Sequence, residues 1–201
     1  MVYVFILLGY LCGSIPFGVL FSRIFRIVDI RNIGSGNIGA TNVFRTGNYK
    51  AAVLTLVFDF LKGFIPVSLY IHAYRFDFAI SLVALSVVIG HVFSIFLKFK
   101  GGKGVATTAG AYCALDGVCF LIGLISWCVV FFSSKISSLA ALISLCVILP
   151  LFVAIMAIHN SNIANILLFA IVNSIMITFT HISNIKRLLE KKELKLTKNN
   201  K

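Results

Sequence analysis

The sequence has few charged residues, and most of them carry the same sign. Charged side chains make up 12% of the 201 residues, with six acidic against 18 basic, which leaves a net charge of +12. Soluble domains carry about 25% charged residues. Hydrophobic residues make up 60%, more than a soluble chain of this length can bury in a core of its own. The composition therefore excludes a soluble globular protein and a disordered one, and predicts a single domain, residues 1–201, dissolved in lipid.

Motifs for disulfides and metals are also missing. The five cysteines lie in apolar stretches, without a CxxC pair and without a neighbouring cluster of histidines. Such cysteines act as small hydrophobic side chains. We expect no disulfide framework, no metal site and no cofactor.

Uncharged stretches long enough to cross a bilayer recur along the chain. Residues 1–22 carry no charged side chain, and basic residues follow this stretch instead of preceding it, so we expect a retained first span and no cleaved signal peptide. The further stretches are 51–71, 78–97, 104–115, 117–134 and 136–180, the last being long enough for two spans with a turn at 159–162.

The distribution of lysine and arginine sets the number of crossings. Basic residues collect at 23–50, at 98–103 and in a tail at 182–201, and such residues favour the cytoplasmic side. An even number of crossings must then separate each pair of basic segments, so 104–134 should fold as a hairpin of two short helices. The sequence predicts an all-α integral membrane protein with seven transmembrane helices, two of them short (about 104–115 and 117–134). Its N-terminus lies outside and its basic tail in the cytoplasm.

Two glycine-rich segments on the predicted cytoplasmic side have the composition of anion sites. Segment 29–50 reads DIRNIGSGNIGATNVFRTGNYK, in which glycines let backbone N–H groups converge on an anion and Arg45 can clamp a phosphate. In the second segment Gly101, Gly102 and Gly104 surround Lys103 directly before a predicted helix, another favourable arrangement for phosphate. The alternative for both is an ordinary basic loop that only sets topology.

Several histidines and one charged pair are further candidates. His181 and Asn184 share a helix face at the cytoplasmic boundary, where a neutral imidazole can accept a hydroxyl proton and an amide can donate to a developing oxyanion. The alternative is an interfacial histidine beside a basic tail. His91 lies inside a span, and Asp59 and Lys62 share a helix face, so we expect the last two to pair as scaffold.

The cytoplasmic segments together resemble the bacterial acyl-phosphate:glycerol-3-phosphate acyltransferases, which are membrane-bound enzymes of phosphatidic acid synthesis. The likeness runs through nearly the whole chain: Gly13-Ser-Ile-Pro-Phe-Gly18, Gly34-Ser-Gly-Asn-Ile-Gly-Ala-Thr-Asn42 with Arg45, Asp59 with Lys62-Gly63, Gly90-His91, Gly101-Gly-Lys-Gly-Val-Ala-Thr107 and His181-x-x-Asn184. The closing motif has Lys191 where the family usually has Gly, so Glu193 is left without an assigned role.

The resemblance implies transfer of a fatty acyl group from acyl phosphate to the sn-1 hydroxyl of glycerol 3-phosphate, giving lysophosphatidic acid and inorganic phosphate. It places His181 and Asn184 at the reacting centre, with His91 in support. The residues that it implies for binding the two phosphates and the acyl phosphate are Ser35, Asn37, Thr41, Asn42, Arg45, Gly101, Gly102, Lys103, Gly104 and Ser138.

A small multi-span transporter for an organic phosphate or another anion is the competing interpretation. It would use the same glycine-broken helices and cations, but the two halves show no inverted repeat and the polar residues gather on one side. For the enzyme we expect a bacterial cytoplasmic (inner) membrane location, an active site on the cytoplasmic face and contact with membrane lipid. We expect no nucleic-acid partner, and protein partners are not predicted.

Overall fold

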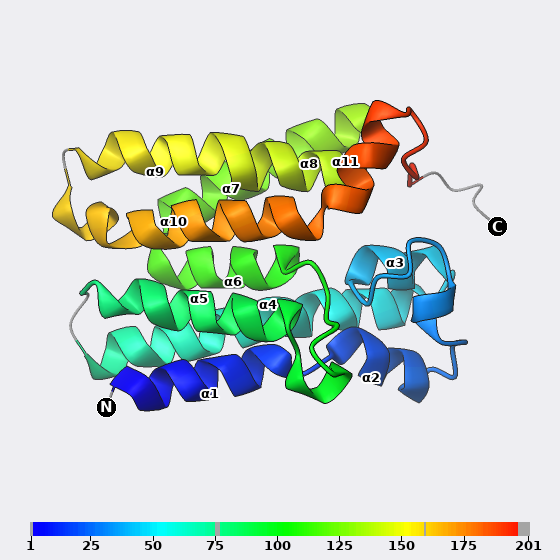
Figure 1. The fold of residues 1–201 in the computed structure, drawn as a ribbon, viewed down its shortest axis with the longest axis horizontal. Helices are drawn as coiled ribbons and strands as arrows, with labels where there is room; N and C mark the ends of the chain where they lie inside the picture. Colours follow the sequence, from blue (N-terminus) through cyan, green and yellow to red (C-terminus); the bar gives the residue numbers. More distant parts are fainter. Residues whose placement is uncertain (1, 75–76, 159, 197–201) are drawn as a thin grey trace.

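The computed structural model describes residues 2–74, 77–158 and 160–196, and within them every regular element is helical (Figure 1). The elements are α1 (Val2–Ser14), α2 (Phe17–Ile24), η1 (Ile30–Asn32), α3 (Ala40–Arg45), α4 (Tyr49–Ala73), α5 (Ala79–Val92), η2 (Ile95–Leu97), α6 (Val105–Leu115), α7 (Gly117–Ser134), α8 (Ser137–Ile143), the π-helical turn η3 (Ser144–Ile148), α9 (Leu149–Ala157), α10 (Ser161–Thr180) and α11 (Ile182–Leu189).

Six segments of the described chain are long and apolar enough to cross a membrane: Val2–Ile24, Tyr49–Ala73, Ala79–Leu97, Gly117–Ser134, Ser137–Ala157 and Ile163–Thr180. The expected hairpin is present as α6 and α7, with the Asp116 carboxylate accepting the Cys119 N–H at 2.7 Å to cap α7. Of the two arms of this hairpin, α6 is short, with 11 residues. The other arm, α7, has spanning length, which corrects the expectation of two short arms. Seven crossings and the orientation of the termini stay predictions.

The first predicted span is present as the apolar segment Val2–Ile24, but a break divides it into two helices. Helix α1 ends at Ser14 and α2 begins at Phe17, because Pro16 has no N–H to continue the ladder and disfavours helical backbone at Ile15. The carbonyl of Ile15 instead accepts a hydrogen bond from Nζ of Lys62 at 2.8 Å. The break turns α2 away from the axis of α1 (Figure 1).

The helices form two layers with α6 between them. In Figure 1 one layer holds α1, α4 and α5, and the other holds α7 to α10. Glycine permits the close packing: a side chain at Gly13 would overlap the backbone of Val87 in α5, and one at Gly63 would overlap the backbone of Thr107 in α6. Small residues at helix contacts are typical of proteins packed in lipid.

Helices α8, η3 and α9 form one long segment that contains the π-helical turn. Pro150, in the first turn of α9, lacks the N–H that a regular helix would use. Two hydrogen bonds join this turn to α10: Ser174 Oγ of α10 donates to the Leu145 carbonyl at 3.1 Å, and Cys146 Sγ of η3 donates to the Ser174 carbonyl at 3.5 Å. The π-helical turn is thus held by hydrogen bonds that a regular helix would not need.

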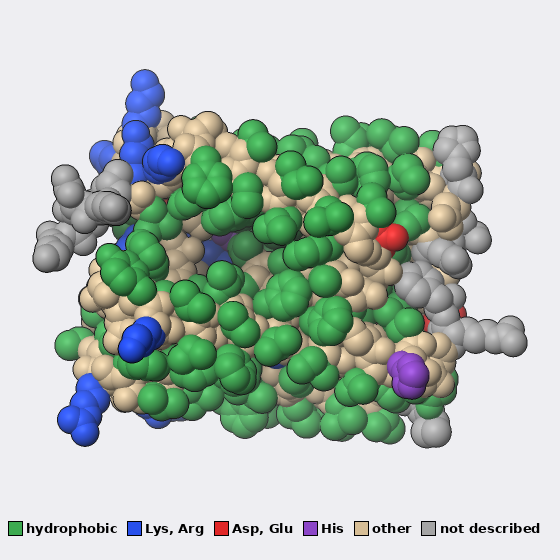
Figure 2. Space-filling view, turned by 180° about the vertical axis from the view of Figure 1, so that it is seen from behind, with side chains coloured by type: hydrophobic (Ala, Val, Ile, Leu, Met, Phe, Trp, Pro, Cys, Tyr) green, Lys and Arg blue, Asp and Glu red, His purple; other side chains and the backbone are tan. Residues whose placement is uncertain are grey.

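Polar and basic residues gather at one end of the bundle. Helices α2, α3 and α11 lie at that end in Figure 1, and Figure 2, seen from behind, shows the Lys and Arg side chains concentrated there beside a broad hydrophobic surface. The segment 29–50, predicted to be a loop, contains η1 and α3, and the predicted tail begins with α11. Of the predicted turn at 159–162, His159 lies outside the described residues. The two glycine-rich segments and His181 therefore share one end of the molecule.

Candidate active site

A cavity of about 840 Å³ opens at the basic end and joins the predicted segments into one site. The polar residues that line it include Ser35, Asn37, Thr41, Asn42, Arg45, Asp59, His91, Lys103, Gly104, Ser137, Ser138, His181, Asn184 and Glu193, and the apolar ones include Leu56, Tyr112, Phe120, Leu124, Trp127, Leu145 and Leu149. Of the predicted site residues, Gly101 and Gly102 are not among the lining residues. A polar head and a long apolar chain could occupy this space together.

The first glycine-rich segment is organised by the side chain of Asn42. This buried amide donates to the carbonyls of Ile30 and Ile33 at 2.8 and 2.9 Å, and its oxygen accepts the Ser35 N–H at 3.0 Å. Both amide protons are thereby used within the loop. The geometry gives Asn42 the role of shaping the loop, instead of the direct phosphate contact that the sequence analysis expected.

Arg45, at the end of α3, has unused hydrogen-bonding capacity at the cavity. Its Nε is buried and has no hydrogen-bond partner among the described residues, while its Nη2 donates to the Leu194 carbonyl at 3.4 Å. A buried donor without a partner is costly, and an anionic ligand would supply the acceptor. Arg45 therefore fits the predicted role of phosphate clamp.

The second glycine-rich segment presents Lys103 and the start of α6 to the cavity. Gly104 has φ +86°, a left-handed conformation that suits glycine, and it precedes the first helical residue. Nζ of Lys103 donates to Oδ1 of Asn184. Within the described chain the N–H groups of Lys103 and Gly104 have no acceptor, so the helix start and the lysine together suit a phosphate.

Gly101 and Gly102 play a different part from the predicted one. The Gly101 N–H donates to the Val92 carbonyl at 2.9 Å and the Gly102 N–H to the His91 carbonyl at 3.0 Å. These N–H groups are used in attaching the loop to the end of α5, so they do not face an anion. The expectation that they bind phosphate directly is corrected accordingly.

The surroundings of Lys103 disfavour its charged, protonated form. Burial lowers the pKa of the Lys103 ammonium to about 8, with Glu193 acting in the opposite direction and Arg187 and Arg45 adding to the lowering. An incoming phosphate would restore the balance of charge. The lysine is therefore prepared for an anionic ligand.

The His181 imidazole is neutral and keeps one ring nitrogen able to accept a proton. Its Nδ1 lies 2.8 Å from the carbonyl oxygen of Ile177, which can only accept, so Nδ1 carries the proton and Nε2 has the free lone pair. Burial, the larger cause, and the charge of Lys103 together lower the pKa of His181 to about 4. The imidazole is therefore neutral at pH 7 and able to accept a proton.

Glu193, left unassigned by the sequence, joins the site through three hydrogen bonds. Its carboxylate accepts from Ser138 Oγ at 2.9 Å, from Asn184 Nδ2 at 2.6 Å and from Arg187 Nε at 2.7 Å. Burial alone would raise the pKa of Glu193, but these donors outweigh it and hold the pKa below its usual value. Glu193 fixes Ser138 and Asn184 relative to each other.

Lys191 lets the chain turn back so that Glu193 reaches the site. It has φ +57°, the left-handed region in which glycine is most favourable. The glycine that the resembled family usually has at this position is therefore explained by the left-handed backbone conformation. Lysine adopts the same conformation here and keeps Glu193 in place.

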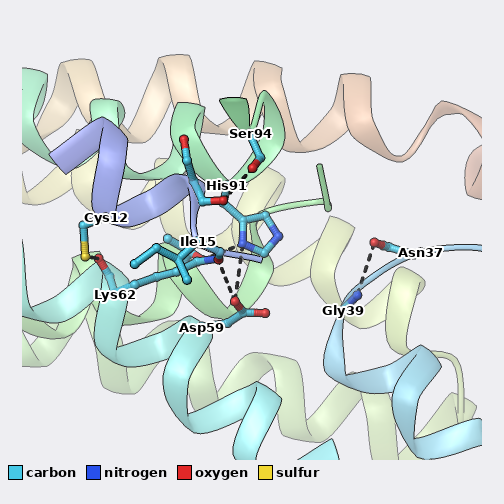
Figure 3. Close-up of polar contacts among 10 residues, drawn as sticks. Cys12, Ile15, Asn37, Gly39, Asp59, Lys62, His91 and Ser94 are labelled. Carbon is cyan, nitrogen blue, oxygen red and sulfur yellow. Dashed lines mark hydrogen bonds and ion pairs between the residues drawn. The ribbon is translucent and has the colours of Figure 1, made fainter. Parts of the chain in front are cut away.

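Asp59, Lys62 and His91 form a buried polar cluster beside the second glycine-rich segment (Figure 3). The predicted pair is confirmed, with Lys62 Nζ 2.7 Å from Asp59 Oδ1. His91 Nδ1 lies 3.0 Å from Thr107 Oγ1 and 3.8 Å from Asp59 Oδ1. The cluster joins α4, α5 and α6 at the inner side of the cavity.

Fold and site define a multi-span helical membrane protein with Lys103 and Arg45 at the polar end of a largely apolar cavity. The profile of the family described as glycerol-3-phosphate acyltransferase matches residues 3–191. The chain is 44% identical to glycerol-3-phosphate acyltransferase of Pelagibacter ubique (strain HTCC1062) over 187 residues, which cover 93% of each chain. It is also 44% identical to the Bartonella quintana (strain Toulouse) enzyme of the same name over 198 residues, 97% of this chain and 92% of the relative.

Solved structures agree with these relatives. The fold is similar to PlsY (YgiH), an integral membrane glycerol 3-phosphate acyltransferase, in its glycerol 3-phosphate form, with a TM-score of 0.90, 36% identity and coverage of 98% and 96% of the two chains. The lysophosphatidic acid form gives a TM-score of 0.88 and 34% identity, with coverage of 98% and 95%. The chain belongs to the glycerol-3-phosphate acyltransferase family.

Proposed function

We propose that this chain transfers a fatty acyl group from acyl phosphate to the sn-1 hydroxyl of glycerol 3-phosphate, giving lysophosphatidic acid and inorganic phosphate. The observation that carries the proposal is the meeting of Lys103, Arg45 and the neutral His181 at the polar end of one apolar cavity. The cations suit two phosphates and the cavity suits an acyl chain. Membership of the family supports the acyltransferase activity, and a transporter is not favoured.

The geometry of the site supports the following binding roles. Arg45 and the loop residues Ser35, Asn37 and Thr41 hold one phosphate, and Lys103 with the N–H of Gly104 holds the other. Ser138, fixed by Glu193, lies at the same polar end of the cavity and contacts the acyl phosphate. The acyl chain lies along the apolar residues between α4, α7 and α8.

The reaction needs positioning and charge neutralisation more than covalent help from the protein. The glycerol hydroxyl oxygen attacks the acyl carbonyl carbon, a C–O bond forms, and the bond between that carbon and the phosphate oxygen breaks. Phosphate leaves with the electron pair of that bond, and Lys103 stabilises the charge that develops. The hydroxyl proton goes to Nε2 of His181 or to an oxygen of the departing phosphate.

The direct test uses purified protein in detergent with acyl phosphate and glycerol 3-phosphate. We expect inorganic phosphate and lysophosphatidic acid to appear in equal amounts, with the acyl group on the sn-1 oxygen. Acyl thioesters serve as control donors and should give no product. Uptake of glycerol 3-phosphate into vesicles without chemistry would instead support a transporter.

We also propose that the site lies on the cytoplasmic face of the bacterial inner membrane, with the N-terminus outside. The concentration of basic side chains at the site end supports this orientation (Figure 2). In a variant without the native cysteines, single cysteines at Lys50 and Lys100 should react with a membrane-impermeant reagent only after the cytoplasmic side is opened. Labelling of the two positions from opposite sides would contradict a shared site.

A further inference from the structure

The buried ion pair of Asp59 and Lys62 has no part in the reaction as described so far. Both residues are 3% exposed within a membrane-spanning helix, and Nζ and Oδ1 are 2.7 Å apart. Burying two charges costs about as much as the pair returns, so well-packed apolar residues would stabilise the bundle equally well. A charged pair at this depth therefore points to a role beyond stability.

The pair is anchored on one side and faces His91 on the other. Lys62 Nζ also donates to the carbonyl of Ile15 at the break between α1 and α2, which fixes its ammonium group. Asp59 Oδ1 lies 3.8 Å from His91 Nδ1, and the same nitrogen is 3.0 Å from Thr107 Oγ1. Figure 3 shows the contacts of Lys62 with Ile15 and of Asp59 with His91. Together with the contact to Thr107, they restrict the imidazole to one orientation.

The ring of His91 in turn supports the glycine-rich loop. A side chain at Gly102 would overlap Nε2 of His91, so the loop backbone lies directly against the imidazole. The His91 carbonyl accepts the Gly102 N–H, and the Val92 carbonyl accepts the Gly101 N–H. The loop thus rests on the end of α5 and against the Nε2 end of the His91 imidazole.

Lys103 follows this supported pair of glycines. Its side chain extends to Asn184, and its carbonyl accepts from Thr180 Oγ1 at 3.3 Å. A shift of the two glycines would carry Lys103 away from Asn184. An unbroken series of contacts therefore leads from the α1–α2 break to the ammonium group at the cavity.

We propose that Asp59 and Lys62 are positioning residues, which act through His91 and the Gly101–Gly102 backbone to hold Lys103 at the reacting phosphate. The inference rests on the role proposed above for Lys103. It assigns to a buried charge pair a place in catalysis that works by positioning, with Lys62 outside the lining of the cavity and Asp59 at its inner side. It also explains why His91 contacts the loop twice, through its ring, which lies against Gly102, and through its carbonyl, which accepts the Gly102 N–H.

A double-mutant cycle tests this proposal. The variant D59L/K62M removes both charges at similar volume, and we expect it to fold in detergent and to lower kcat/KM about tenfold. In a Lys103→Ala background the same pair of changes should cost less than about twofold, because the lysine that it positions is gone. Residual turnover is measured by phosphate release over long incubations.

A matched control is the buried hydrogen bond between Thr108 Oγ1 and Asn173 Oδ1, 2.9 Å long, which joins α6 to α10 without involving His91, Gly101 or Gly102. The variant T108V/N173L should give the same fold-change with Lys103 or Ala at 103. Equal losses in both backgrounds for D59L/K62M would show a purely structural pair and overturn the inference.

A second, milder variant serves if the charge-free pair does not fold. Thr107→Val keeps the shape of the side chain and removes only its contact with His91. We expect Thr107→Val to lower kcat/KM about tenfold, as D59L/K62M does. In the Lys103→Ala background the same change should cost less than about twofold. Turnover by the unmodified chain checks the proposed reaction, so failure of that reaction and failure of the inference give different results.

Discussion

Nζ of Lys103 donates a hydrogen bond to Oδ1 of Asn184, although 81 positions of sequence separate the two residues. The contact joins the second glycine-rich segment to the C-terminal helix at the cavity. Asn184 also donates a hydrogen bond to the Glu193 carboxylate, which accepts two more from Arg187 and Ser138. One amide thus connects the cation proposed to bind phosphate with the carboxylate that orders the C-terminal segment.

Replacing Lys103 by alanine tests the cation directly. We expect turnover to fall about 100-fold or more, because a charge aimed at the developing phosphate is lost from a dry site. The protein should remain folded in detergent, since the loop keeps its attachment to α5. Lys100→Ala, at an exposed position of the same segment, is the control and should retain normal turnover. Near-normal activity of the Lys103 variant would refute the assignment.

Replacing His181 by alanine distinguishes a base from a binding residue. If Nε2 accepts the hydroxyl proton, kcat should fall about 100-fold with little change in the KM for glycerol 3-phosphate. His72→Ala, at an exposed histidine in the last turn of α4, should leave both constants unchanged. A raised KM with normal kcat would make His181 a binding residue, and a small effect on both would favour proton transfer to the leaving phosphate.

The pH profile follows from two shifted groups. His181, with a pKa of about 4, loses its free lone pair as the pH falls through that value, and Lys103, with a pKa of about 8, loses its charge as the pH rises through that value. We therefore expect kcat/KM to be highest between about pH 4 and pH 8 and to fall on either side.

The arginine variant identifies the alkaline limb of that profile. In Lys103→Arg the guanidinium stays charged, so the decline above pH 8 should move upward by more than one unit. An unchanged alkaline limb would assign the decline to another group. The acidic limb, which belongs to His181, should stay in place and serves as the internal control.

Glu193→Gln tests the cluster at the C-terminal end. The neutral amide keeps the shape but loses the charged partner of Arg187, so we expect kcat to fall about tenfold through loss of order at Ser138 and Asn184. The side chain of Glu190 contacts Lys192 at the surface, so Glu190→Gln is the matched control and should leave kcat unchanged. Equal activity of both variants would exclude a role for Glu193.

Much of the site could be predicted from the sequence because its chemistry is local. Glycines close in sequence to Lys103 and Arg45 were the signal for the proposed anion sites, and the charge bias predicted that the three basic segments lie on one side. The use of individual atoms could not be predicted. Asn42 and the N–H groups of Gly101 and Gly102 have the right chemistry for phosphate, but the tertiary structure uses them to hold backbone.

The misses have physical causes as well. Pro16 marks the break in the first span, but the sequence analysis relied on the length of the apolar stretch and did not use the proline. Glu193 was hidden because Lys191 adopts a conformation that sequence rules assign to glycine. The pairing of Asp59 with Lys62 was predicted from spacing, whereas its proximity to His91 depends on the packing of α4 against α5 and could be seen only in three dimensions.

The π-helical turn at Ser144–Ile148 has a consequence for comparing and redesigning members of this family. A π-helical turn usually marks one inserted residue that a helix absorbs without breaking. Ser138 and Ala141 before it, and Leu145 and Leu149 in and after it, face the same cavity. Deleting one residue here would rotate everything beyond it relative to the cavity, so a shortened homologue or a designed variant would need a compensating change in α10, where Ser174 now supports the turn.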